Sequence, residues 1–421
     1  MTGQHSIKKG IGIIFDKIFL VNGMRTPFGK YCGTLSQVSP TDLGICSARA
    51  ALEKAKVSPD AVDQVIAANI GQSSGDAYFL PRHISLFAGI PEEVPSLMVQ
   101  RICGSGFETI VAAAEQITLG KAGTVLCVGT ETMSLAPTAS FGNRSGYPLG
   151  RPGFIDMLWE ALDDTAAGYS MALTGENVAK KLSITRQECD DYAFSSFQRA
   201  LDAKQRDFFA GEVTPVNTVT FTAGELKPRK LRLPRGVENF TSDEHVRATT
   251  RESLAKLAST FSADGVLTAG NCSGIVDGAA SVVIASQQSI DDKGLKPIAR
   301  VVAATSVGID PRYMGLAPVP AIQHLLEISG LQVSDIGLFE INEAFSAQVI
   351  GCERELGLDR ARLNVNGGAI ALGHPLAATG VRLSLTISRE MQARNVRFGI
   401  VSACIGGGQA TAVLLENTAC N

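Results

Sequence analysis

Short apolar runs of strand length alternate along the chain with longer, helix-like stretches. In the first part of the chain, this pattern predicts strands over residues 18–21, 65–70, 124–128 and 280–285, and helices over 41–55 and 106–119. From residue 299 the alternation is repeated, with strands over 336–341 and 398–403 and helices over 319–329 and 380–393. Alternation of this kind predicts an α/β protein with mostly parallel sheets and helices on both faces.

The segment 135–262 departs from this pattern. Its stretches 141–148 and 227–235 have the composition of loops, and it has too few long apolar runs for another sheet. We interpret it as an insertion, and its basic run 227–235 as a solvated surface strip. The expected organisation is an N-terminal extension, a first half in two pieces, the insertion and a second half, over residues 1–17, 18–134 plus 263–292, 135–262 and 293–421.

Composition limits the classes of function. The chain has 421 residues, of which 45% are hydrophobic and 43 are glycine, so it can bury two sizeable cores or one very large one. Its formal net charge is −3 and its aromatic content is 6%. These values provide no general attraction to nucleic acid or to an anionic membrane. We therefore expect no nucleic-acid partner.

The cysteines bear on metal binding and location. There are nine, with no Cys-x-x-Cys pair and no clustering with the five histidines, which argues against a disulfide framework and against a zinc site. We therefore expect no metal and a reducing compartment, the cytoplasm. No apolar run reaches the roughly 18 residues of a membrane span, and residues 1–17 lack a secretory cleavage pattern. We expect no membrane span.

Cys103 is the first candidate for chemistry. It lies in the run Gln-Arg-Ile-Cys-Gly-Ser-Gly over 100–106, directly before the helix-like stretch 107–117. A cysteine at such a turn lies beside unpaired backbone N–H groups and the positive end of the helix dipole, which favour the thiolate. A small cysteine before a Gly-rich turn can also be only a packed residue. This segment alone leaves both interpretations open.

Three further segments hold possible partners for a catalytic thiol. His374 stands between Gly and Pro, so its ring is presented from a loop and could serve as a base. Cys404 ends an apolar strand before three glycines, where it could carry a proton while the amide of Gly406 holds an oxyanion. Asn342 follows another apolar strand and could fix a water or an oxyanion. Taken singly, these residues could equally be a structural imidazole, a packing thiol and a helix cap.

Together these segments resemble the thiolase family. The chain carries Cys-Gly-Ser-Gly at 103–106, Asn-Glu-Ala-Phe at 342–345, Gly-His-Pro at 373–375 and Cys-x-Gly-Gly-Gly at 404–408, in the family's order. Two more matches lie at 24–30 and 265–274, so the resemblance covers nearly the whole chain. It implies two similar halves packed as a five-layered αβαβα sandwich with an inserted loop domain.

The resemblance implies an acyl-CoA C-acyltransferase that catalyses a reversible Claisen condensation. Cys103 would carry the acyl group, His374 would activate it, and Cys404 would exchange the proton of the enolate. Asn342 would hold a water, and the N–H groups of Cys103 and Gly406 would form an oxyanion hole. Coenzyme A would be a substrate, and no cofactor would be needed.

The resemblance also implies contacts with the acyl-CoA. Arg247 matches an arginine that packs on the adenine, a geometry that suits a planar guanidinium. Phe261, Ala269 and Ser273 match positions along the pantetheine, and Met171 and Phe345 match positions at the acyl end. Ser170 replaces the histidine usual beside Met171 in short-chain members, whereas residues 374–380 resemble long-chain members. Acyl length and the direction of the reaction therefore stay open.

Two other functions remain to be weighed. A different condensing enzyme would have no reason to keep Cys404 in a Gly-rich turn. A non-catalytic protein that binds coenzyme A or lipid would be expected to lose at least one of Cys103, His374, Asn342 and Cys404, yet all four are present. By the same resemblance we expect a homodimer or a homotetramer.

Overall fold

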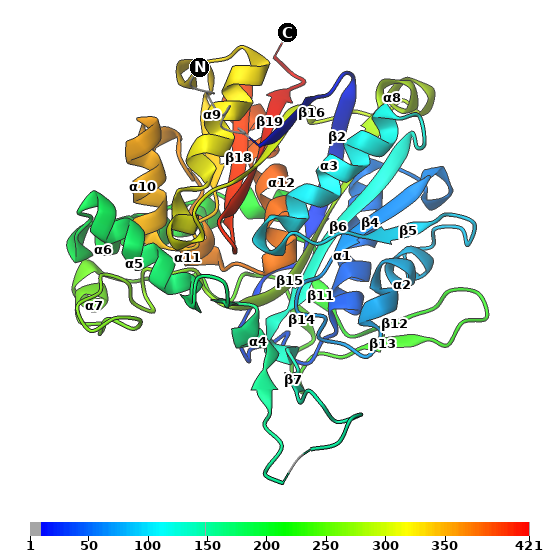
Figure 1. Ribbon diagram of the computed structural model, residues 1–421. Helices are drawn as coiled ribbons and strands as arrows, with labels where there is room; N and C mark the ends of the chain where they lie inside the picture. The colour runs from blue at the N-terminus through cyan, green and yellow to red at the C-terminus, as the bar shows by residue number, and fades with distance from the viewer. Residues whose placement is uncertain (1–9, 148, 421) are drawn as a thin grey trace, which may run out of the picture.

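One long mixed sheet runs through the protein, as a computed structural model that describes residues 10–147 and 149–420 shows (Figure 1). Its strand order is β17-β18-β19-β16-β2-β15-β6-β4-β5, with β1 added to β16 and β3 added to β15. The strands are β1 Ile11–Ile14, β2 Ile18–Arg25, β3 Gly29–Lys30, β4 Gln64–Ala68, β5 Ser96–Met98, β6 Thr124–Thr132, β15 Val276–Ser286, β16 Ala299–Gly308, β17 Leu338–Ile341, β18 Phe398–Ile405 and β19 Gln409–Asn417.

The sheet consists of two parts joined by a short seam. Strands β2 to β6 with β15 form the first part, and β16 to β19 form the second. The seam is the pairing of β16 with β2, which covers only Ala299 with Leu20 and Arg300 with Phe19. The N-terminal segment crosses this seam, because β1 pairs with residues 303–306 of β16 before the chain enters β2.

The prediction of mostly parallel sheets is wrong. Among the strands of the described residues, only β17–β18, β4–β5 and β4–β6 pair in parallel, and the central pairs are antiparallel. Strands such as β6 and β15 are nevertheless buried along almost their whole length. Helices cover both faces of these strands, so their sequences are continuously apolar in the way that parallel strands usually are.

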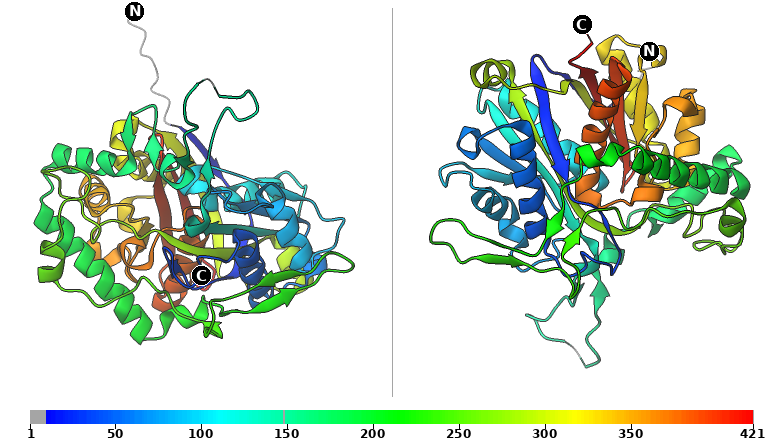
Figure 2. Two further views of the ribbon diagram at one scale, coloured as in Figure 1. Left: turned by 90° about the horizontal axis from the view of Figure 1, so that it is seen from below. Right: turned by 180° about the vertical axis from the view of Figure 1, so that it is seen from behind.

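The helices complete five layers (Figures 1 and 2). Helices α3 (Ser105–Thr118) and α12 (Leu376–Arg394) lie between the two parts of the sheet. Helices α1 (Pro40–Ala55) and α2 (Leu80–Phe87) cover the outer face of the first part. The outer face of the second part carries α9 (Pro318–Ser329), with α10 (Ser346–Leu356) beyond it. The expected αβαβα sandwich is confirmed.

The central helices α3 and α12 approach each other closely. A Cβ atom at Gly106 would lie 2.7 Å from both the carbonyl oxygen of Ala377 and the amide nitrogen of Gly380. In turn, a Cβ atom at Gly380 would collide with the backbone of Phe107. Glycine at these two positions lets the backbones meet. The N-terminal ends of both helices, which follow Cys103 and His374, are thereby brought together.

The segment between β6 and β15 adds helices and short hairpins. Its helices α5 and α6 pack against α10, and a capping box at Thr185 starts α6. Two hairpins, β7–β8 and β12–β13, project from the body of the protein (Figure 1). The helices are α4 Met157–Glu160, α5 Met171–Leu182, α6 Arg186–Gln205 and α7 Arg251–Ala255, with α8 Gln287–Lys293 after β15; the strand pairs are β7 Thr138–Ala139 with β8 Ile155–Asp156, β9 Asp163–Asp164 with β10 Tyr169–Ser170, β11 Val216–Asn217 with β14 Asn239–Phe240, and β12 Val219–Phe221 with β13 Arg229–Leu231.

Within the described residues, no helix is long and apolar enough to cross a membrane. The basic run 227–235 lies on the β12–β13 hairpin and is mostly exposed. Among the basic side chains of this run, Arg229 is the exception, because it pairs with Asp42 at 2.7 Å and with Asp76 at 2.6 Å. This arginine therefore anchors the hairpin to the first half.

Candidate active site

Cys103 stands in a tight turn at the start of α3. The turn is a short 3-10 segment over Ile102–Gly104, and Ile102 has a left-handed backbone with φ of 43°. Burial raises the pKa of the Cys103 thiol to about 11, while the backbone N–H groups of Gly406 and of Cys103 itself act in the opposite direction. The sequence predicted a thiolate. Burial outweighs the N–H groups in the free protein, so the thiol form prevails there.

His374 lies between the short helix α11 (Ala369–Leu372) and α12. Its Nδ1 is 2.6 Å from the hydroxyl oxygen of Thr379, and that hydroxyl donates to the carbonyl of Pro375 at 3.2 Å. Nδ1 therefore carries the proton and donates it to Thr379, which leaves Nε2 as an acceptor. Nε2 is buried and has no hydrogen-bond partner in the described part of the chain. Burial, assisted by Arg382, lowers the imidazole pKa to about 3.

Cys404 lies near the end of β18. Its side chain is buried, and burial raises the thiol pKa well above its usual value, with Cys103 adding to the effect. Cys103, His374 and Cys404 line one cavity of about 140 Å³. The cavity thus brings together two protonated thiols and one neutral imidazole.

Asn342 follows β17, and its backbone N–H donates at 2.9 Å to the carbonyl oxygen of Ser402 on β18, the strand that carries Cys404. Its side-chain oxygen and nitrogen are both buried, and neither has a hydrogen-bond partner among residues 10–147 and 149–420. Buried amides in proteins are nearly always paired, so this one calls for a ligand or a water. Asn342 does not line the cavity itself.

Gly406 lies in the turn between β18 and β19, where Gly407 and Gly408 have φ of 81° and 74°. These values lie in the left-handed region, which favours glycine. The turn presents the Gly406 N–H to the sulfur of Cys103. A backbone donor beside the nucleophile is the arrangement of an oxyanion hole.

The predicted acyl-CoA contacts fall into two groups. Met171, Phe261, Ser273 and Phe345 line the same cavity as Cys103. Arg247 and Ala269 are exposed and do not line it. Arg247 stacks its guanidinium over the ring of Phe197 on α6, 4.8 Å from the ring centroid.

Sequence reasoning missed the apolar wall of the cavity. Its members are spread over separate segments of the chain and carry no motif, so no local signal identifies them. They include Met133, Trp159, Leu162, Ile275, Met314 and Leu376. Trp159 is the only tryptophan of the chain and is half exposed at the mouth of the cavity.

Sequence reasoning also missed Glu343, although it stands beside Asn342. Its buried carboxylate accepts hydrogen bonds from four groups, which belong to α6, to Asn364 and to the segment that leads into His374. The donors are Tyr192 Oη at 3.0 Å, Ser196 Oγ at 2.6 Å, Asn364 Nδ2 at 3.0 Å and the Ile370 N–H at 3.1 Å. A carboxylate buried next to a candidate site could have been recognised from its place in the motif.

Glu131 has a similar role in the first half, at the end of β6. It accepts hydrogen bonds from the N–H groups of Ile70 and Gly71 after β4 and from the N–H of Ala377 in the first turn of α12. Asn69 Nδ2 donates to it at 2.9 Å. Burial raises the pKa of this carboxyl to about 7 despite these donors. Glu131 thus joins the first half to the helix that follows His374.

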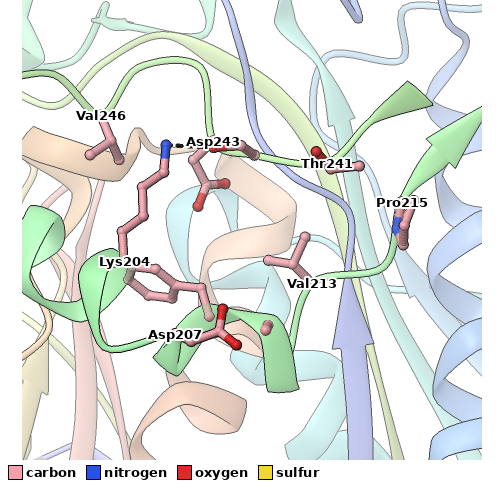
Figure 3. Close-up of a pocket in the computed structure, with 10 residues that line it drawn as sticks. Lys204, Asp207, Val213, Pro215, Thr241, Asp243 and Val246 are labelled. Carbon is pink, nitrogen blue, oxygen red and sulfur yellow. Dashed lines mark hydrogen bonds between the residues drawn. The ribbon is translucent and has the colours of Figure 1, made fainter. Parts of the chain in front are cut away.

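A larger cavity of about 350 Å³ lies elsewhere, between α6 and the segment 241–246 (Figure 3). Two of its charged groups are already engaged: Asp243 accepts from the buried Arg25 at 2.7 and 2.8 Å, and Lys204 donates to Ser242 at 2.8 Å. It contains neither cysteine nor histidine. The small cavity with two thiols and an imidazole is therefore the stronger candidate for an active site.

This fold and this site define a class of protein, the enzymes that transfer acyl groups through a cysteine. Two family models match the chain: "Thiolase, N-terminal domain" over residues 18–288 and "Thiolase, C-terminal domain" over 295–417. The chain belongs to the thiolase family.

Individual relatives agree over nearly the full length. The chain is 45% identical to a mitochondrial 3-ketoacyl-CoA thiolase of Bos taurus, over 96% of this chain and 98% of that protein. It is 41% identical to an acetyl-CoA acetyltransferase of Escherichia coli strain K12, over 94% and 98%. Among solved structures, human mitochondrial 3-ketoacyl-CoA thiolase in complex with CoA matches with a TM-score of 0.91 and 42% identity, over 97% of this chain and all of that one.

Proposed function

We propose that the protein is an acyl-CoA C-acyltransferase that catalyses thiolysis of 3-ketoacyl-CoA and the reverse condensation of acetyl-CoA with acyl-CoA. The observation that carries the proposal is the single cavity lined by Cys103, Cys404 and His374, in which His374 Nε2 is an unpaired acceptor. The names of the thiolase and acetyltransferase relatives support the same substrates.

In thiolysis, His374 Nε2 takes the proton of Cys103, whose sulfur attacks the 3-keto carbon. The C2–C3 bond breaks, the acyl group stays on Cys103, and the electron pair leaves as the acetyl-CoA enolate. Cys404 protonates this enolate. The Cys404 thiolate then takes the proton of an incoming coenzyme A thiol, whose sulfur attacks the acyl group. Cys103 leaves as the thiolate and regains its proton from His374.

The neutral forms of His374 and Cys404 suit this sequence of proton transfers. A buried imidazole with a pKa of about 3 is unprotonated at neutral pH and can accept the thiol proton. Cys404, whose pKa is raised well above its usual value, holds its proton until the strongly basic enolate forms. The N–H of Gly406 stabilises the acyl oxygen, and a water on the unpaired Asn342 amide stabilises the enolate oxygen.

No metal or redox cofactor enters this mechanism, because each proton transfer has a side chain of its own and coenzyme A acts as a substrate.

The predicted contact of Arg247 with the adenine of coenzyme A stays a proposal. The exposed guanidinium of Arg247 leaves it accessible to a ligand.

The experiment measures the coenzyme A-dependent loss of enolate absorbance of 3-ketoacyl-CoA esters from four to sixteen carbons. Cys103→Ala should lower kcat by at least about 10³-fold, because the acyl intermediate cannot form. Cys420→Ala, which removes a thiol near the C-terminus, is the matched control and should retain activity. If the wild type binds coenzyme A but cleaves none of these esters, a binding protein or another condensing enzyme replaces the proposal.

We also propose that the protein forms a homodimer or a homotetramer. The loop between β7 and β8 projects from the body of the protein (Figure 1). Its side chains Phe141, Leu149 and Phe154 are exposed. Several apolar side chains gathered on a projecting loop favour contact with a second copy.

We propose the cytoplasm as the location. All nine cysteines are free thiols, which supports a reducing compartment. Several relatives are mitochondrial proteins by name, so the mitochondrion is the alternative. Fractionation of cells that express the tagged protein separates the two.

A further inference from the structure

Glu131 meets the helix that follows His374 at one particular residue, Ala377. The N–H of Ala377 donates to Glu131 Oε2 at 3.3 Å. It is one of the first N–H groups of α12, which have no acceptor within the helix itself. Gly129 lies on the same face of β6 as Glu131, and a Cβ atom built there would collide with the carbonyl oxygen of Ala377. One face of β6 therefore meets both backbone polar groups of Ala377.

The link from Ala377 to the imidazole of His374 is short and stiff. Only Pro375 and Leu376 separate the two residues, and the ring of Pro375 fixes its φ angle. The imidazole itself is bonded through Nδ1 to the hydroxyl of Thr379, at 2.6 Å, two residues beyond Ala377 on the same helix. A displacement of Ala377 therefore displaces the imidazole as well.

The other hydrogen bonds of Glu131 connect it to the side of the nucleophile. Asn69 Nδ2 and the N–H of Gly71 donate to Oε1 at 2.9 and 2.8 Å, and the N–H of Ile70 donates to Oε2 at 3.1 Å. Ile70 and Cys103 pack against the same small group of buried apolar side chains, which consists of Met133, Leu158 and Leu376. One buried carboxylate thus connects the segment beside Cys103 with the turn that holds His374.

We propose that Glu131 is a positioning residue, which holds His374 Nε2 at the distance from Cys103 at which it takes the thiol proton. The inference rests on the proposed acyltransferase function. It adds a group that touches neither the substrate nor the reacting atoms, because Glu131 does not line the cavity of Cys103. Loss of its hydrogen bonds should slow the reaction and leave substrate binding unchanged, since a misplacement of about 1 Å can cost about 10²-fold in rate.

Gly71→Ala is the sharpest test, because it changes neither a charge nor a hydrogen-bond donor. Apart from the chain neighbours of Gly71, a Cβ atom built there meets only Glu131, with Oε1 at 3.0 Å and Cδ at 4.0 Å. The new methyl group therefore pushes on this carboxylate alone. In thiolysis of a four-carbon 3-ketoacyl-CoA ester, kcat should fall at least about threefold while both KM values stay within about twofold of wild type.

Gly75→Ala is the matched control, because it makes the same change four residues further along, where a Cβ atom meets nothing within 4 Å. It should keep the wild-type kcat and KM values.

Glu131→Gln removes the carboxylate itself and should lower kcat at least about tenfold, again with KM values within about twofold. Glu212→Gln is its matched control. Glu212 is equally buried and accepts from Thr386 at 3.0 Å, so it holds the middle of α12 rather than its start. This control should lower the melting temperature but keep kcat per folded molecule.

A double-mutant cycle separates positioning from a general loosening of the fold. If Glu131 acts through the imidazole, Glu131→Gln should change kcat by less than about twofold in the His374→Ala background. Melting temperatures show which variants are folded, and if Glu131→Gln does not fold, the comparison of Gly71→Ala with Gly75→Ala decides.

The proposal is overturned if a folded Gly71→Ala or Glu131→Gln keeps the wild-type kcat, or if the loss appears in KM instead. It is also overturned if Glu131→Gln costs the same factor with and without His374. A wild type that cleaves no ester contradicts the proposed function instead, so the two failures are distinguishable.

Discussion

Burial controls the reactivity of the two thiols and the imidazole at the candidate site. Cys103 lies beside backbone N–H groups that favour a thiolate, yet burial raises its pKa to about 11. His374 is neutral because burial lowers its pKa to about 3. The free protein therefore holds a thiol and a neutral base in one cavity, and in the proposed mechanism the ion pair forms only when a substrate is attacked.

The first prediction concerns the alkylation of Cys103 by iodoacetamide. A raised pKa means that the thiolate is scarce at pH 7 and increases about tenfold per pH unit towards pH 11. The labelling rate of the peptide that contains Cys103, followed by mass spectrometry, should therefore rise steadily from pH 7 to pH 10. A rate that is already constant below pH 8 would show an ordinary or activated thiolate.

The second prediction concerns Glu343→Ala. The change leaves four buried donors without their acceptor, so the free energy of unfolding should fall by about 3–5 kcal/mol. Glu355→Ala removes an exposed carboxylate from the same region and should change it by less than about 0.5 kcal/mol. Urea denaturation measures both values, and equal losses would disprove the role of Glu343.

At the scale of elements, the close approach of α3 and α12 positions the site. Both helices begin directly after a candidate catalytic residue, and Gly106 and Gly380 allow their backbones to meet. The spacing of the two helices therefore sets the distance between Cys103 and His374.

The third prediction follows from this contact. Gly106→Ala forces the helices apart and should lower the free energy of unfolding by about 1–3 kcal/mol. It should also lower kcat in the protein that remains folded, because the two catalytic candidates move apart. Gly75→Ala is the matched control, because a Cβ atom there meets nothing within 4 Å. The Gly106 hypothesis is wrong if both variants keep wild-type kcat and melting temperature.

Apolar patterning located the elements better than it located their pairing. The predicted helix over 41–55 is α1, and the predicted strand over 124–128 begins β6. The pattern could not reveal that β15 and β19 run antiparallel to their neighbours, because strands covered on both faces are apolar throughout in either direction. The short seam between β16 and β2 depends on packing and has no local signature.

Motifs located the thiols and the imidazole of the site, whose side chains meet at one cavity although 301 residues separate Cys103 from Cys404 in numbering (404 minus 103). The apolar wall could not be predicted, since Met133, Trp159 and Leu376 become neighbours only through tertiary packing. The value of the Cys103 pKa could not be predicted either, because burial is a property of the folded chain.

At the scale of the whole molecule, the projecting loop between β7 and β8 carries the exposed apolar side chains Phe141 and Phe154. The fourth prediction is that the double variant Phe141→Ser and Phe154→Ser lowers the mass of the assembly, for example from a tetramer to a dimer, because the apolar contact with a second copy is lost. Light scattering after size-exclusion chromatography measures the mass. An unchanged mass would exclude this loop as the contact. Tyr78→Ser, at another exposed aromatic residue, serves as the control and should leave the mass as in the wild type.

Trp159 gives the molecule an optical property of its own. As the only tryptophan, half exposed at the rim of the cavity that holds Cys103, it is the sole source of indole fluorescence. Its emission should shift to shorter wavelength when a ligand displaces water from the ring. The unlabelled protein can therefore report the occupancy of its own site in real time, in a stopped-flow instrument and without a coupled assay.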